Sequence, residues 1–147
     1  MPERETIERA ERDREQGKSP STQAGEFVRE EMHHIREGKH GAASAKQAIA
    51  IGLSKARRAG VNLRPPAKGK ASAKTRRSAA SAWRKGRRGT PTSRTRSQAR
   101  SKALRREGRA AASHRALSRQ ARSAAQRRGS ASRKAAARKA ARTRARR

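Results

Sequence analysis

Arginine and lysine side chains recur in short runs along the chain, and the chemistry open to them is the binding of phosphate. A guanidinium group offers a planar pair of N–H donors that matches two phosphate oxygens, whereas an ammonium group acts as a point charge. We therefore expect a nucleic-acid-binding surface made by Lys39, Lys46, Lys55, Arg57, Arg58, Arg76, Arg77, Arg84, Lys85, Arg87, Arg88, Arg105, Arg106, Arg127, Arg128, Arg146 and Arg147.

Two local features could add to phosphate binding. The loop of residues 39–41 leads into a helix that Ser44 can cap, and the N–H groups of a helix start, with Lys46 nearby, can hold an anion. Trp83 lies in the basic run SAWRKGRRG and could stack on an unpaired base. The alternatives are an ordinary capped helix beside a solvated loop, and an indole without a partner.

The histidines raise the question of a metal site. His33, His34 and His40 lie near Glu30 and Glu37 in the sequence. Glu30 and His34 are four residues apart and share a helical face. Adjacent histidines, however, point to different faces, and no complete ligand set is visible. We predict a solvated polar face and no metal site.

No set of residues indicates catalysis. The carboxylates cluster on charged segments, and a chain without cysteine has no thiol nucleophile, disulfide or thiolate metal site. A core this small cannot enclose a substrate cavity. We predict that the protein is not an enzyme, has no catalytic residues and uses no cofactor.

The net charge of +31 is distributed unevenly. Residues 1–37 hold 7 basic and 10 acidic residues, and residues 38–63 hold 5 basic residues and no acid. Residues 64–147 hold 30 basic residues and a single acid, Glu107. A segment of this kind repels itself and calls for a polyanion to neutralise it.

Large apolar residues are scarce. Hydrophobic residues make up 31% of the chain, but the only aromatic ones are Phe27 and Trp83. No run approaches the ~20 apolar residues of a membrane-spanning helix, and the N-terminus lacks the apolar segment of a signal peptide. We expect a cytoplasmic protein that does not bind membranes.

The helical pattern is confined to the first 63 residues. Residues 1–18 predict a charged helix that frays, because only Ile7 and Ala10 are apolar. Residues 19–63 predict a helical hairpin, whose helices begin at caps near Ser19 and at Ser44 and end near Gly38 and Gly60. Its expected core is Phe27, Val28, Met32, Ile35, Ile49, Leu53, Val61 and Leu63. So small a unit could need self-association or a protein partner.

Residues 64–147 are rich in Arg, Lys, Ala and Ser. We predict a disordered low-complexity tail, because charge repulsion opposes its helix-forming alanines and arginines until phosphates arrive. The expected fold class is mostly α-helical and disordered: a small helical hairpin with a charged N-terminal helix and a long basic tail.

Residues 22–61 carry a resemblance, centred on the run GKHGAASAKQAIAIGLSKARRAG. The segment resembles an uncharacterised family of small basic bacterial proteins, a domain of unknown function. This resemblance implies a bacterial cytoplasmic protein and supplies no activity or catalytic residues. The tail resembles linker-histone tails in composition.

These patterns together favour sequence-independent binding of nucleic acid, with DNA preferred, by a histone-like protein of the nucleoid. RNA or the ribosome is an alternative target, because both polymers present phosphates. A protein-interaction module with a basic electrostatic anchor is a second alternative.

Overall fold

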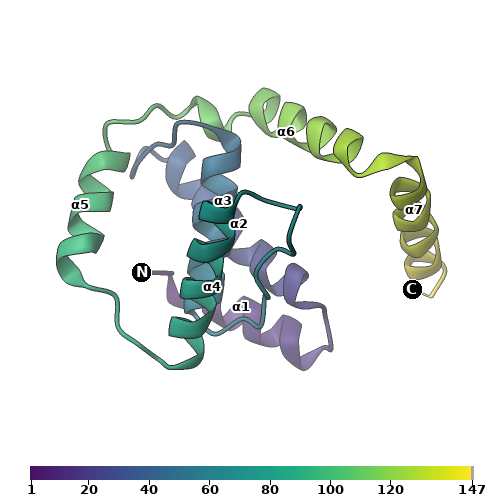
Figure 1. Cartoon of the computed structure of the whole chain (residues 1–147), viewed down its shortest axis with the longest axis horizontal. Coiled ribbons are helices and arrows are strands. Elements are labelled where there is room, and N and C mark those ends of the chain that lie inside the picture. Colours follow the sequence, from purple (N-terminus) through teal and green to yellow (C-terminus); the bar gives the residue numbers. More distant parts are fainter. Residues whose placement is uncertain (147) are drawn as a thin grey trace.

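The structure is a computed structural model that describes residues 1–146, and its regular elements are all helices. In chain order they are α1 (Arg4–Glu15), α2 (Pro20–Arg36), α3 (Ala45–Arg58), α4 (Ala73–Arg87), α5 (Arg94–Leu104), the short 3₁₀ helix η1 (Ala110–Ala112), α6 (His114–Arg127) and α7 (Gly129–Ala145). In Figure 1, α1 to α4 form a packed body, α5 stands beside it, and α6 and α7 extend away from it.

The two helices of the hairpin begin and end close to the residues that the sequence indicates. The Ser19 hydroxyl accepts a hydrogen bond from the backbone N–H of Thr22, and the Ser44 hydroxyl accepts one from Gln47. Gly38 and Gly60, with φ of 78° and 95°, follow the helices in the left-handed conformation that glycine adopts without strain.

Alanine dominates the core. Ten of the thirteen buried hydrophobic residues within residues 1–146 are alanines, and the larger ones are Phe27, Met32 and Ile35. All of these buried residues except Ala45, Ala79 and Ala82 form two clusters, one around Phe27 between α1, α2 and α3, and one around Ile35 that also takes in η1 and α6. Short side chains let helix backbones come close, so little apolar volume is needed to fill the core.

Two glycines mark the closest approaches of the helices. A Cβ built on Gly52 of α3 would lie 2.7 Å from the Cα of Val28 in α2. A Cβ on Gly86 of α4 would overlap the carbonyl oxygen of Arg57 at the end of α3. Glycine is therefore required where α3 crosses its neighbours on both sides.

The prediction that the N-terminal helix frays is wrong. Helix α1 packs along α2, and Thr6, Ala10 and Asp13 are buried in the contact. Arg9 of α1 lies 2.7 Å from the Glu26 carboxylate of α2, and this hydrogen bond raises the pKa of Arg9. Sequence reasoning missed the contact because it counted only the two apolar residues of α1.

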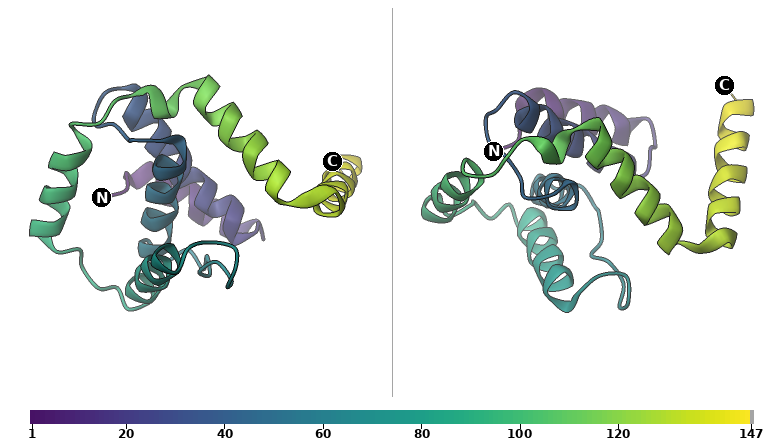
Figure 2. Two further views of the ribbon diagram at one scale, coloured as in Figure 1. Left: turned by 45° about the horizontal axis from the view of Figure 1, so that its top comes forward. Right: turned by 90° about the horizontal axis from the view of Figure 1, so that it is seen from above.

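The prediction of a disordered tail is also wrong. Residues 64–146 contain α4, α5, η1, α6 and α7. Ala79 and Ala82 of α4 are buried in the face toward α3, while Ala111, Ala112 and Leu117 join the cluster around Ile35. Figure 2 shows α4 beside α3, and α6 leaving the body from the end at which η1 docks.

The prediction of a disordered tail failed because of the residues on which it was based. It counted large apolar residues, which the tail lacks, and gave charge repulsion more weight than helix propensity. Serine caps start α4 and α6, where Ser72 and Ser113 accept hydrogen bonds from the backbone N–H groups of Thr75 and Ala116. Most basic side chains on these helices are exposed, so solvent and salt screen their repulsion.

The sequence predicts that no segment is apolar enough to form a membrane-spanning helix. None of the helices within residues 1–146 combines the length and the apolar character that a membrane-spanning segment requires.

We expect Gly86→Ala to destabilise the protein. In an undocked helix this change would favour helix formation by about 1 kcal/mol. Against α3 the new methyl group meets the Arg57 carbonyl, and such overpacking costs about 1–3 kcal/mol. Gly25→Ala is the control, because its Cβ would lie in open space on α2. Chemical denaturation measures both, and a Gly86→Ala protein more stable than the parent would show that α4 is not docked.

Candidate functional site

Within residues 1–146, ion pairs neutralise charged side chains in the first half of the chain only. Every ion pair found within residues 1–146 joins residues between Glu3 and Lys55. The basic side chains from Arg57 to Arg146 take part in none of them. This follows from the sequence, because ten of the eleven acids lie in residues 1–37.

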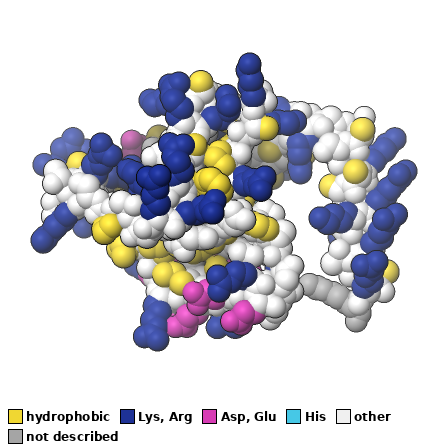
Figure 3. All heavy atoms as spheres, turned by 60° about the horizontal axis from the view of Figure 1, so that its bottom comes forward, with side chains coloured by type: hydrophobic (Ala, Val, Ile, Leu, Met, Phe, Trp, Pro, Cys, Tyr) yellow, Lys and Arg dark blue, Asp and Glu magenta, His cyan; other side chains and the backbone are white. Residues whose placement is uncertain are grey.

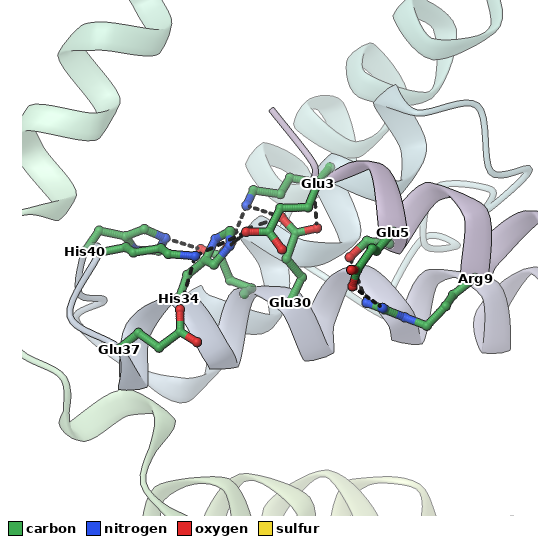
Figure 4. A network of polar contacts seen from close by, with 11 residues as sticks. Glu3, Glu5, Arg9, Glu30, His34, Glu37 and His40 are labelled. Carbon is green, nitrogen blue, oxygen red and sulfur yellow. Dashed lines mark hydrogen bonds and ion pairs between the residues drawn. The ribbon is translucent and has the colours of Figure 1, made fainter.

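A buried polar cluster pairs the acidic side chains on the inner face of α2 with a lysine of α3. Lys55 of α3 places its ammonium group 2.7 Å from Glu31 and 3.3 Å from Glu30, and both carboxylates are almost fully buried. The second oxygen of Glu30 accepts a hydrogen bond from the backbone N–H of Glu3. Figure 4 shows how this cluster joins the N-terminal residues to α2.

The outer edge of the same cluster holds the N-terminus in place. His34 Nε2 lies 2.8 Å from Glu3 Oε1, and Lys39 lies 3.2 Å from Glu3 and 3.1 Å from Glu37. Hydrogen bonds from His34 and Lys39 lower the pKa of Glu3 to about 2. Hydrogen bonds to Glu37 and Glu3 raise the pKa of Lys39. Lys39 and Lys55, which were predicted to bind nucleic acid, thus form ion pairs with carboxylates of the protein itself.

Arg57 and Arg58 connect segments of the chain. Arg57 is buried, which lowers its pKa, and its Nε–H donates a hydrogen bond to the carbonyl of Leu63. Arg58 donates to the Thr90 carbonyl and, at 2.8 Å, to the Thr92 hydroxyl. These two residues, predicted to bind nucleic acid, hold the segments that flank α4.

Trp83 is occupied on one side. Its indole N–H donates to the Asn62 side chain at 3.2 Å, and the Arg87 guanidinium carbon lies 4.9 Å from the ring centroid. Arg64 also lines the hollow of about 390 Å³ beside the ring. Stacking on a base, which the sequence analysis considered, would require the other face of the ring or displacement of Arg87.

The anion site expected before α3 is partly satisfied by the protein. The Ser44 hydroxyl accepts from the N–H of Gln47, and the Gln47 side chain accepts from the N–H of Ala43. Lys46 is exposed beside them. The geometry is that of an ordinary capped helix.

Most of the remaining predicted residues do form an exposed surface. Arg76 and Lys85 are half-buried on α4. The exposed ones are Arg77, Arg84, Arg87, Arg88, Arg105, Arg106, Arg127, Arg128 and Arg146. Arg147 lies outside the described residues.

The longest regular rows of basic side chains were missed by the sequence analysis. Arg115, Arg119 and Arg122 lie on one face of α6, opposite Leu117, which packs on the body. Lys134, Arg138 and Arg142 make a similar row on α7. Their spacing of three and four residues was visible in the sequence, but it has meaning only once these segments are helices.

Figure 3 shows the resulting division of charge. Lys and Arg side chains cover the body and the C-terminal helices at the right, while acidic side chains gather at the lower edge of the body. Helix α5 packs against no other helix within residues 1–146, and α7 contacts only α6. Both therefore present basic side chains around most of their circumference: Arg94, Arg96, Arg100 and Lys102 on α5, and Arg133, Lys134, Arg138, Lys139, Arg142 and Arg144 on α7.

The comparisons with known proteins yield no relative. No family model, no curated protein and no solved structure matches this chain. The resemblance to a family of small basic bacterial proteins stays a prediction.

We expect Lys55→Met to destabilise the fold strongly. It leaves the Glu30 and Glu31 carboxylates buried beside an apolar side chain, and removal of one partner from a buried ion pair costs about 3–5 kcal/mol. Lys46→Met, at an exposed position of the same helix, should change the free energy of unfolding by less than about 0.5 kcal/mol.

The double variant Glu31→Gln/Lys55→Met is a further control. Because it removes one buried charge together with the ammonium group, it should recover part of the lost stability. Equal stability of the Lys55→Met and Lys46→Met proteins in urea denaturation would contradict a buried ion pair.

Proposed function

We propose that this protein binds nucleic acid, with DNA as the preferred target, by contacting backbone phosphates through the basic helices α4 to α7. The observation that carries this proposal is the unneutralised positive charge of those helices. Within residues 1–146, none of the basic side chains from Arg57 onward has an acidic partner at ion-pair distance. A polyanion is the ligand that such a surface attracts.

Arginine supplies the specific chemistry. It outnumbers lysine on α6 and α7, and its guanidinium group can donate two parallel hydrogen bonds to one phosphate. The row Arg115, Arg119 and Arg122 follows a helix face, so its members can reach successive phosphates of one strand. Release of condensed counterions from the nucleic acid then drives binding.

The ordered arrangement gives the charge a defined reach. Helix α7 has 17 residues and is about 25 Å long at 1.5 Å per residue. It turns away from α6 at Gly129, which has a φ of 73°. The two helices therefore offer two basic rods in different directions, suited to follow a bent or crossing polyanion (Figure 1).

Recognition of base sequence has little support in this surface. Side chains that commonly read base edges together with arginine, such as Asn and Gln, are sparse on α4 to α7, and Trp83 is engaged with Arg87 and Asn62. Binding is therefore independent of sequence, as in proteins that coat or compact DNA. A location on the bacterial nucleoid in the cytoplasm belongs to the same proposal.

The test is a salt titration of binding to a DNA duplex with two matched variants of the full chain. Arg138→Gln/Arg142→Gln removes two exposed charges from α7, whereas Arg12→Gln/Arg14→Gln removes two from α1. The slope of log affinity against log salt should fall by up to about 2 for the α7 variant, at roughly 0.9 per lost phosphate contact. The α1 variant should keep the parent's slope.

Each outcome has a definite meaning. Equal loss in both variants would show that net charge alone governs binding, and a parent protein that ignores DNA at 50 mM salt would end the proposal. Two unrelated duplexes should compete within a few-fold of each other, and a preference of orders of magnitude would contradict sequence independence. Structured RNA that displaces duplex DNA at lower concentration would transfer the same surface to RNA.

A further inference from the structure

We propose that Glu31, His34 and His40 form a binding site for a divalent transition-metal ion, with Zn²⁺ as the ion that best suits their donor atoms. The three residues come from the inner face of α2 and from the loop before α3. Each offers one ligand atom, and these atoms all lie within 4.8 Å of one another. Figure 4 shows His34 and His40 converging above α2. The site is separate from the basic helices and does not depend on the proposed function.

The donor set fits zinc, and so does the spacing of one pair of its ligand atoms. Zinc binds imidazole nitrogen and carboxylate oxygen at about 2.0–2.2 Å in a tetrahedral arrangement, which puts neighbouring ligand atoms about 3.3 Å apart. His40 Nε2 lies 3.3 Å from Glu31 Oε1. Two histidines and one glutamate make a three-residue site that leaves a fourth position open.

Hydrogen bonding of His40 calls for a cation at this point. Its Nδ1 lies 3.0 Å from the Gly41 carbonyl oxygen, which can only accept, so Nδ1 carries a proton. In a neutral ring Nε2 then holds a lone pair, and this lone pair faces the Glu31 carboxylate. Two lone pairs 3.3 Å apart repel each other unless a proton or a metal ion lies between them.

The Glu31 carboxylate is also short of hydrogen bonds. It is fully buried, and neither oxygen accepts a hydrogen bond of acceptable geometry. The Lys55 ammonium group lies 2.7 Å from one of these oxygens and forms an ion pair with the carboxylate. Because the geometry of this contact is not that of a hydrogen bond, the oxygen keeps a lone pair free for another ligand. A buried carboxylate in this condition is costly unless something else binds it.

His34 has the outer partners that metal-binding histidines need. Its Nε2 lies 2.8 Å from Glu3, and its Nδ1 lies 3.9 Å from Glu30. When Nδ1 coordinates the ion, the Glu3 carboxylate at hydrogen-bond distance from Nε2 fixes the tautomer and orients the ring. The backbone carbonyl of Gly41 plays the same part for His40.

The local charge also favours a cation. The carboxylates of Glu3, Glu30, Glu31 and Glu37 face the ammonium groups of Lys39 and Lys55, which leaves two negative charges when both imidazoles are neutral. Sequence reasoning had paired Glu30 with His34 and found no complete set. The fold directs Glu31 inward instead and brings His40 from the loop.

A bound ion would fix the loop that anchors the second half of the chain. Directly after His40, the N–H of Gly41 donates to the carbonyl of Leu104, and the N–H of Ala42 donates to that of Gly108. The loop is thus the seat of the connection between α5 and η1. Metal binding to the native state alone would raise the melting temperature by linkage.

The test uses the full chain and the nitrogen resonances of its four histidines, with Zn²⁺ added stepwise at neutral pH. The imidazole nitrogens of His34 and His40 should shift and saturate at one equivalent, while those of the exposed His33 and His114 stay unchanged. Shifts confined to His33 or His114, or no shifts at all, would overturn the proposal. A proton that persists on His40 Nε2 in excess Zn²⁺ would show an imidazolium in place of the metal and would overturn it equally.

Variants give a second measurement. His40→Ala should weaken Zn²⁺ binding, followed by calorimetry, by roughly tenfold or more, since loss of even an outer partner typically costs 10–100-fold. His33→Ala is the matched control on the adjacent α2 surface and should bind as the parent does. Equal affinities for the two variants would contradict the site, and circular dichroism of both confirms that each is folded.

Discussion

Close contact between helix backbones is the constraint on which this structure depends. With ten alanines among thirteen buried hydrophobic residues in the described chain, the core has little side-chain volume to spare. The helices must approach until backbone meets backbone, as Gly52 does against Val28 and Gly86 against Arg57. Dispersion forces at such contacts are short-ranged, so a gap of one methyl group would remove them. The same close packing lets an arginine-rich segment fold, because its contacts with the body need mainly alanine and glycine.

Charge is organised around this core in two different ways. Acidic side chains of α1 and α2 meet lysines and histidines within the fold, and the cluster of Glu3, Glu30, Glu31 and Lys55 joins three segments at one point. Basic side chains of the later helices meet solvent. Within residues 1–146, eight of the eleven acids form ion pairs inside the chain, which leaves most arginines of this protein of +31 net charge available to a partner. Folding and phosphate binding thus draw on separate sets of charged residues.

The limits of prediction from the sequence follow from the same facts. The hairpin was predictable because Ser19, Ser44, Gly38 and Gly60 are strong local signals for helix ends. The tail was not predicted, because the apolar faces of α4 and α6 consist mainly of alanine, such as Ala79 and Ala82, and the prediction counted only large apolar residues. The environment of individual residues was equally hard to predict from the sequence. Arg57 reads as one more exposed arginine until Gly86 is seen to cover its carbonyl, and Glu31 reads as a solvated acid until Lys55 and His40 are seen to surround it.

The attachment of α7 separates two requirements that usually conflict in a protein. Its 17 residues touch the rest of the chain only through α6, beyond the turn at Gly129, and none of them is buried. Substitutions in α7 do not alter the core, so the sequence of this helix can change without loss of stability of the body. Related chains could differ in the length, charge or number of such terminal helices and still share one body.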